Sequence, residues 1–252
     1  MPPARHPNKM LLRPPKQDSA ARLFCFPYSG LGASMYNKWP DRIGDIEICR
    51  IQPPGRENRL REPHYGTYDA LAEQVVEALL PHFDRPFAFF GHCGGALPGF
   101  ATALLLARSG LPTPRTLFIS SQVAPHVGPF GRFLRMSNAE LAVELAELTK
   151  AMGGAPTPDM IQMSLRVLRA DVTANQEYHL ARPVTLPCDV RVLGWRDDQE
   201  IRPDQMGEWS AYADAGKYTE TVLEGGHHAF LDAPDELLAE LAGALRATEP
   251  LR

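Results

Sequence analysis

The stretch from Phe87 to Ala96, FAFFGHCGGA, decides the fold of this chain. Its apolar start is typical of a buried strand, and an apolar helical pattern continues from its end to residue 108. A strand, a sharp turn and a helix form the context of a nucleophile elbow, whose strained backbone requires small residues two positions before and after the nucleophile. Gly91 and Gly95 meet that requirement around Cys93. The stretch therefore predicts Cys93 at the carboxyl end of a central strand in an α/β fold.

The same alternation of short apolar runs and helical patterns continues along the chain, as expected for a mostly parallel sheet flanked by helices. We expect strands at residues 22–27, 46–52, 86–91, 115–120, 189–194 and 218–223. We expect helices at residues 68–83, 94–108 and 235–247. Residues 125–183 hold helical patterns at 138–152 and 159–178 without a good strand. We interpret this segment as a helical lid insertion over the site, the alternative being an ordinary helical decoration.

Composition narrows the class of protein. The 252 residues with a net charge of −4 suit one α/β domain and argue against a nucleic-acid partner, because phosphate binding favours a basic face. We expect a single domain at residues 21–252 after a proline-rich, poorly ordered lead-in at residues 1–20 that lacks a signal-peptide pattern. The apolar runs are too short to span a bilayer, so no membrane partner is expected. The four scattered cysteines indicate reduced thiols in a cytoplasmic protein, which we expect to be a monomer.

A cysteine nucleophile needs a base and an acid, and two later strand ends supply both. His227 and His228 follow two glycines after the last expected strand, and Asp197 and Asp198 follow the strand at 189–194. The order nucleophile, acid, histidine is that of the α/β-hydrolases. We choose His227 as the base because it directly follows the glycines. Asp198 is our choice of acid, with Asp197 as a rival that closes the turn.

Two backbone amides complete the predicted site. The start of the helix after Cys93 places the N–H of Gly94 where an oxyanion forms. The glycine-rich loop FPYSGLGAS at residues 26–34 directs the N–H of Ser29 toward the same point. We therefore predict Ser29 and Gly94 as the oxyanion hole, and we predict no cofactor and no metal. His92 is expected to point away from the cleft into a packed, hydrogen-bonded position.

The predicted lid carries apolar residues at helical spacing. Leu141, Leu145 and Leu148 recur along its first helix, and Met160 and Met163 add adaptable apolar surface that we expect next to the cleft. We predict that these residues select the acyl chain. The alternative is that they only bury the lid against the core, which explains the same pattern.

Taken together, these motifs resemble the type II thioesterases that accompany polyketide synthases and nonribosomal peptide synthetases. The matching pieces are LFCFPYSGLGAS (23–34), IQPPGRENRLREP (51–63), RPFAFFGHCGGA (85–96), ISSQVAPH (119–126), VLRADVTANQEY (167–178), LGWRDD (193–198) and GGHHAFL (225–231). The resemblance implies an α/β-hydrolase fold with a helical lid. It also implies a thioesterase that removes acyl groups from the phosphopantetheine arm of an acyl or peptidyl carrier protein.

The chain departs from this family at the nucleophile. The family usually has Ser at the position of Cys93 and Met at that of Gly94, and a Gly-Arg sequence where this chain has SSQ at 120–122. An acyl group on a thiol stays activated, especially toward amines, so transfer or cyclisation onto an amine or alcohol acceptor is an alternative to hydrolysis. Two further alternatives are a Cys-His-Asp lactone hydrolase and an inactive carrier-binding protein.

Overall fold

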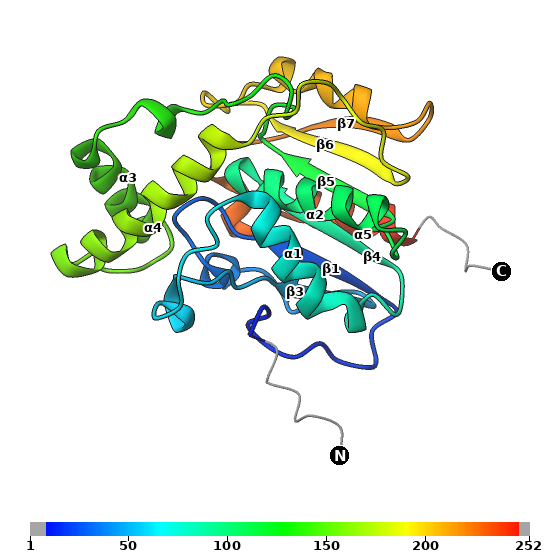
Figure 1. Ribbon diagram of the computed structural model, residues 1–252, viewed down its shortest axis with the longest axis horizontal. Coiled ribbons are helices and arrows are strands. Elements are labelled where there is room, and N and C mark those ends of the chain that lie inside the picture. The colour runs from blue at the N-terminus through cyan, green and yellow to red at the C-terminus, as the bar shows by residue number, and fades with distance from the viewer. Residues whose placement is uncertain (1–8, 247–252) are drawn as a thin grey trace.

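Seven strands form one sheet within residues 9–246, the part of the chain that this computed structural model describes (Figure 1). They are β1 Ala21–Phe26, β2 Arg42–Ile43, β3 Ile46–Arg50, β4 Phe87–His92, β5 Thr116–Ser120, β6 Asp189–Trp195 and β7 Tyr218–Leu223. Their order is β2-β3-β1-β4-β5-β6-β7, and all neighbouring pairs are parallel except β2 with β3. The six expected strands are thus confirmed, and β2 adds a two-residue edge strand without a sequence signal.

Helices cover both faces of this sheet, with α1 and α2 on one face and α5 on the other (Figure 1). The α-helices are α1 Tyr68–Leu79, α2 Ala96–Arg108, α3 Asn138–Ala151, α4 Pro158–Glu177 and α5 Asp235–Arg246. The short 3-10 helices are η1 Ala33–Tyr36, η2 Glu57–Arg59, η3 Leu80–His82, η4 Cys93–Gly95, η5 Arg132–Arg135, η6 Pro203–Gln205, η7 Gly207–Tyr212 and η8 Ala229–Asp232. The helix expected at 94–108 therefore begins as the 3-10 turn η4, and the helix expected at 68–83 ends as η3, where Pro81 cannot donate a helical hydrogen bond.

The central strands are buried on both faces. Side chains alternate along β1, so Phe24 and Phe26 pack on the side of α1 and α2, while Leu23 and Cys25 pack on the side of α5. β4 lies between β1 and β5, and all of its residues are buried. The turn that follows β4 therefore emerges from the centre of the sheet, at the edge where the parallel strands end.

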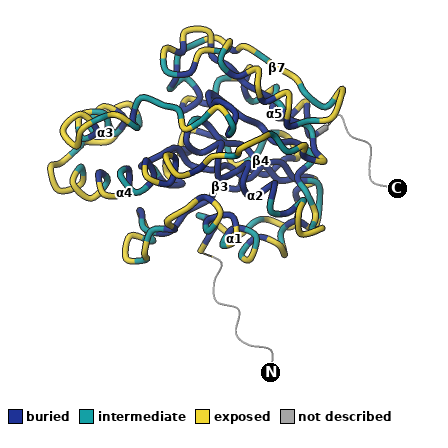
Figure 2. The backbone as a smooth tube through the Cα atoms, turned by 45° about the horizontal axis from the view of Figure 1, so that its top comes forward, coloured by how far each residue is buried: buried dark blue, intermediate teal, exposed yellow. Residues whose placement is uncertain are grey.

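The expected helical insertion is present between β5 and β6 and consists of η5, α3 and α4. Ser137 caps α3 in a capping box, since its hydroxyl accepts from the N–H of Glu140 while the Glu140 side chain accepts from the N–H of Ser137. Figure 2 shows that the outer turns of α3 and α4 are exposed, whereas the sheet beside them is buried. The function of this segment as a lid stays a prediction.

The start of the chain packs against the edge of the sheet as far as the structure describes it. Residues 1–8 of the predicted lead-in lie outside the described residues. Met10 and Leu11 are buried, and the N–H of Gln52 donates to the carbonyl of Met10 at 2.9 Å. Among the helices within residues 9–246, none combines the length and the apolar character that crossing a membrane requires.

Candidate active site

Cys93 lies in the turn between β4 and α2. Its backbone φ is +49°, in the left-handed region that a non-glycine residue enters at a cost of roughly 1–2 kcal/mol. A Cβ on Gly91 would overlap the carbonyl of Gly95, and a Cβ on Gly95 would lie 2.6 Å from the carbonyl oxygen of Pro27. The two glycines are therefore required by space. Cys93 is half-buried, whereas the other three cysteines are buried, and this burial raises their pKa values.

The structure brings Asp198 and His227 together beyond the ends of β6 and β7. His227 Nδ1 lies 2.8 Å from Asp198 Oδ2, and the Ser121 hydroxyl donates to the same oxygen at 2.7 Å. The N–H groups of Glu200 and Ile201 donate to Asp198 Oδ1 at 2.8 and 3.0 Å. Burial opposes the charge of Asp198, but the hydrogen bond from His227 and those from its other donors hold its pKa below the usual range. Asp198 is therefore a carboxylate placed to accept a hydrogen bond from His227 Nδ1. The roles of these two residues as acid and base stay a prediction.

His227 Nε2 is the nitrogen through which the ring can exchange a proton with Cys93. It has no hydrogen-bond partner among the described residues, and it lies 3.5 Å from Glu200 Oε2. Burial opposes protonation of the ring, but the hydrogen bond to Asp198 and the nearby Cys93 thiol raise the pKa of His227 to about 10. A basic imidazole is the kind of group that can accept a proton from a neighbouring thiol.

Asp197 and His228, the alternative acid and base, do not make the contact that Asp198 and His227 make with each other. Asp197 is exposed, and its N–H donates to the Gly225 carbonyl at 2.9 Å, which joins the loop after β6 to the loop after β7. His228 Nε2 has no hydrogen-bond partner in the described part of the chain, and burial lowers the pKa of this ring. His92 is buried with Nδ1 at 2.8 Å from Ser120 Oγ, as expected, but its ring lies 4.7 Å from the ring of His227, so it does not point away from the site. The geometry therefore favours Asp198 and His227 over Asp197 and His228.

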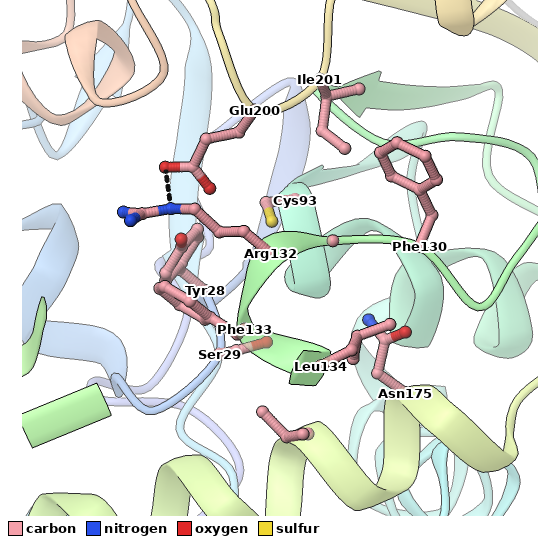
Figure 3. Close-up of a pocket in the computed structure, with 12 residues that line it drawn as sticks. Tyr28, Ser29, Cys93, Phe130, Arg132, Phe133, Leu134, Asn175, Glu200 and Ile201 are labelled. Carbon is pink, nitrogen blue, oxygen red and sulfur yellow. Dashed lines mark ion pairs between the residues drawn. The ribbon is translucent and has the colours of Figure 1, made fainter. Parts of the chain in front are cut away.

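Ser29 packs directly against the backbone of Gly94. A Cβ on Gly94 would overlap Ser29 Oγ and would lie 3.6 Å from the backbone nitrogen of Ser29. Ser29 and Cys93 also line one cavity (Figure 3). The two segments whose amides are expected to bind an oxyanion are thus neighbours beside Cys93, while their role in catalysis stays a prediction. The absence of a side chain at Gly94 leaves the space that the Ser29 side chain fills.

The cavity beside Cys93 is small. It has a volume of about 20 Å³, which is room for about one water molecule. Its walls include lid residues, among them Phe130, Phe133, Leu134 and Val172. Arg132 and Glu200 supply the charged part of the wall (Figure 3). A cavity of this size, with the side chains as they lie, has no room for an acyl chain beside the sulfur.

A buried carboxylate ties α4 to the loop after β1. Asp171 is 1% exposed, and it accepts from the N–H of Gly30 at 2.6 Å and from both terminal nitrogens of Arg56 at 2.8 Å. His64 Nε2 and the Tyr65 hydroxyl lie 2.7 and 2.5 Å from Asp171 Oδ1. Burial opposes the charge of Asp171, but Arg56 and His64 hold its pKa well below the usual range. Sequence reasoning missed this cluster, although Arg56 and Asp171 both lie in motifs that carry the family resemblance.

The two methionines of α4 lie away from the Cys93 cavity, contrary to expectation. Met160 and Met163 are 46% and 42% exposed and line a separate groove of about 480 Å³ on the other side of the Gly30 loop. Leu141, Leu145 and Leu148 are buried in the core cluster on the α5 side of the sheet. The arrangement favours packing as the role of the leucines.

One cluster has the composition of a metal site. Glu200, His227 and His228 offer ligand atoms within 4.8 Å of one another. However, Glu200 is paired with Arg132 at 2.8 Å, and His227 is held by Asp198. Two of the three side chains are thus already engaged in contacts within the protein.

Comparison with known proteins places this site in a family context. A family model described as the thioesterase domain matches residues 21–248. The chain is 32% identical to the linear gramicidin dehydrogenase LgrE of Brevibacillus parabrevis, over 96% of this chain and 94% of that protein.

Two solved structures resemble the whole chain. RedJ, a thioesterase from the prodiginine pathway of Streptomyces coelicolor, is 34% identical with a TM-score of 0.75, covering 90% of this chain and 91% of that one. BorB, a type II thioesterase from the borrelidin biosynthetic cluster, is 27% identical with a TM-score of 0.82, covering 96% of this chain and 100% of that one. LgrE is named as an oxidoreductase, whereas the family model and both structures are named as thioesterases.

Proposed function

Since the chain belongs to the thioesterase domain family, we propose that it releases acyl groups from the phosphopantetheine arm of an acyl or peptidyl carrier protein. The chain is a hydrolase that acts on thioesters. The likeness to RedJ and BorB supports a type II thioesterase of polyketide or nonribosomal peptide biosynthesis. We infer that the reaction proceeds through an acyl-enzyme on Cys93.

The proposed reaction has two halves. Cys93 Sγ attacks the thioester carbonyl while His227 Nε2 takes the thiol proton, and the N–H groups of Ser29 and Gly94 bind the oxyanion. Collapse breaks the bond to the pantetheine sulfur, which leaves with the proton from His227, and Cys93 keeps the acyl group as a thioester. Water then attacks this thioester, with His227 as the base, and the carboxylic acid leaves as the Cys93 thiol reforms.

The observation that carries this proposal is the environment of the His227 ring, namely its contact with Asp198 and its raised pKa. Asp198 orients it at 2.8 Å, and the nearby Cys93 thiol contributes to the rise of its pKa to about 10. A thiol in the left-handed turn at +49° beside such a base has the features of an activated nucleophile. The buried Cys25, Cys49 and Cys188 have no comparable setting, because burial disfavours their thiolates.

Acyl transfer is the second candidate, and the observation that favours it is the thiol itself. Attack of Cys93 on a thioester makes another thioester, so the first half-reaction is nearly balanced in free energy and the acyl group stays reactive. An amine or alcohol acceptor that enters in place of water then receives the acyl group, and Cys93 is released in the same way. The lactone hydrolase and the inactive carrier-binding protein are further outcomes that the same experiment separates.

The test is intact-protein mass spectrometry after mixing the chain with acyl-carrier substrates, with and without amine or alcohol acceptors. We expect an acyl adduct that is lost in Cys93→Ala and retained in Cys188→Ala, the matched control at a buried thiol. Hydrolysis then gives the free acid, and transfer gives an acceptor adduct. Cys93→Ser distinguishes the candidates further, because an oxoester partitions less toward amines than a thioester does.

Some results contradict the proposal. Turnover of free lactones that does not depend on a carrier protein would support the lactone hydrolase. Tight carrier binding without any adduct on Cys93 would support the inactive binding protein. If Cys93→Ala hydrolyses carrier-bound thioesters at the original rate, Cys93 is an ordinary thiol and the proposed site is wrong.

A further inference from the structure

A series of ion pairs connects the lid segment with His227. Arg132 in η5 pairs with Glu144 of α3 at 2.7 Å, and its Nε lies 2.8 Å from Glu200 Oε1. The other oxygen of Glu200 lies 3.5 Å from His227 Nε2. Figure 3 shows the pair of Arg132 and Glu200 beside Cys93. Two side chains therefore connect the lid with the nitrogen that exchanges a proton with the thiol.

Glu200 is an unfavourable neighbour for a thiol nucleophile. A negative charge at this position stabilises the protonated His227 but opposes a second negative charge on Cys93. Its oxygen also competes with the sulfur for the proton on Nε2. The side chain of Glu200 is 14% exposed, so water screens its charge only in part. Arg132 counters both effects, because it neutralises Glu200 and holds the carboxylate by its other oxygen.

We propose that Arg132 and Glu200 are positioning residues that make the reactivity of Cys93 depend on the closed lid. In the closed arrangement, Arg132 neutralises Glu200, and His227 is available to the thiol. When the lid segment that carries Arg132 moves away, Glu200 accepts a hydrogen bond from the Nε2–H of His227 and opposes charge on Cys93. The inference rests on the proposed function, since it takes Cys93 and His227 as nucleophile and base.

The other ionisable groups around Cys93 and His227 come from β4, α1 and the loops after β1, β6 and β7. They are His92, Tyr68, Tyr28, Asp198 and His228. Burial raises the pKa of both tyrosines and lowers that of both histidines, which keeps these four groups neutral near neutral pH. The pKa of Asp198 is lowered despite its burial, by its hydrogen bond with His227, and this carboxylate keeps its charge. Of the described groups around Cys93 and His227, Arg132, Glu200 and Glu144 thus provide the charges that a lid movement rearranges.

The experiment measures the alkylation of Cys93 by iodoacetamide in the full chain as a function of pH, with Cys93→Ala as the background from the buried thiols. An added negative charge raises the pH midpoint of thiolate formation, and its removal lowers the midpoint. Arg132→Gln is expected to raise the midpoint by about one pH unit, and Glu200→Gln to lower it by roughly half a unit to one unit. The double variant Arg132→Gln/Glu200→Gln is expected to return close to the wild-type midpoint. Glu177→Gln removes an exposed carboxylate at the end of α4 and is the control, which is expected to leave the midpoint unchanged.

The double variant separates a charge effect from a disturbed lid. If Arg132→Gln leaves the midpoint unchanged, or if the double variant stays shifted as far as Arg132→Gln alone, Glu200 does not control Cys93 and the inference is overturned. Acyl-enzyme formation by the wild type is measured in parallel. If no acyl-enzyme forms, the proposed function is refuted. If an acyl-enzyme forms but the pH midpoints of alkylation do not differ between the variants, the inference alone is refuted.

Discussion

Replacing Asp171 by Asn tests how firmly α4 is tied to the loop after β1. The substitution keeps the size of the side chain and removes the charge that faces Arg56. Both residues are buried, at 1% and 4% exposure, and they share a two-point hydrogen bond at 2.8 Å. Removing one partner of a buried ion pair typically costs about 3–5 kcal/mol, because the other charge is left without compensation. We therefore expect the free energy of unfolding of Asp171→Asn to fall by about 3–5 kcal/mol.

The assay is equilibrium unfolding in urea, followed by circular dichroism and by tryptophan fluorescence. Glu177→Gln is the matched control, because it removes a carboxylate from an exposed position on the same helix and should cost less than about 0.5 kcal/mol. Replacing both partners, as in Arg56→Met/Asp171→Leu, should cost less than Asp171→Asn alone, since no buried charge is then left unpaired.

The lowered pKa of Asp171 determines the direction in which its contribution to stability changes with pH. The folded-state pKa of Asp171 lies well below the value in the unfolded chain, which is about 3.9. Its contribution is therefore complete above about pH 4 and is lost as the pH falls through the folded-state pKa. A loss of less than about 1 kcal/mol in Asp171→Asn at neutral pH, equal to that of Glu177→Gln, would refute the assignment of Asp171 as the tie between α4 and the loop.

The remaining predictions concern the proposed base and acid. His227→Ala should lower turnover of acyl-carrier substrate by about 10²–10⁴-fold, and His228→Ala by far less, in steady-state assays; the reverse ranking would move the base to His228. Asp198→Asn should reduce the same rate more than Asp197→Asn, because Asp198 holds His227 whereas Asp197 is exposed. The pKa of His227 is raised to about 10 from an unfolded value near 6.5, so its contribution to stability is complete below about pH 6.5 and is lost as the pH rises toward 10. Tm measured across this range should decline less in His227→Gln than in the wild type, and equal slopes would contradict the raised pKa.

Features with a local pattern could be predicted from the sequence. The strand, the glycines and the helix around Cys93 are contiguous, and the Asp198 and His227 loops each follow a recognisable strand. The glycines at 91 and 95 were predicted for the reason that the structure gives, which is lack of space for a Cβ. The mostly parallel sheet followed from the alternation of apolar runs and helical patterns.

Contacts between distant segments could not be predicted in this way. Ser121 reaches Asp198 from 77 positions away, and Arg56 reaches Asp171 from 115 positions away. Such pairs depend on the topology of the sheet and on how the lid lies over it, and neither leaves a periodic signal near the residues. The position of Met160 illustrates the same limit, because helical spacing indicated an apolar face of α4 without indicating which cavity that face would line.

The contact between Ser29 and Gly94 constrains how this chain can evolve. In the present background, any side chain at position 94 meets the hydroxyl of Ser29 at its first carbon atom. A side chain at position 94 is therefore accommodated once position 29 has become smaller or Ser29 has turned aside. The two positions are epistatic, and the order of substitutions matters. Mutant libraries that randomise positions 29 and 94 together would measure this coupling, because they sample side chains at position 94 with and without the Ser29 hydroxyl.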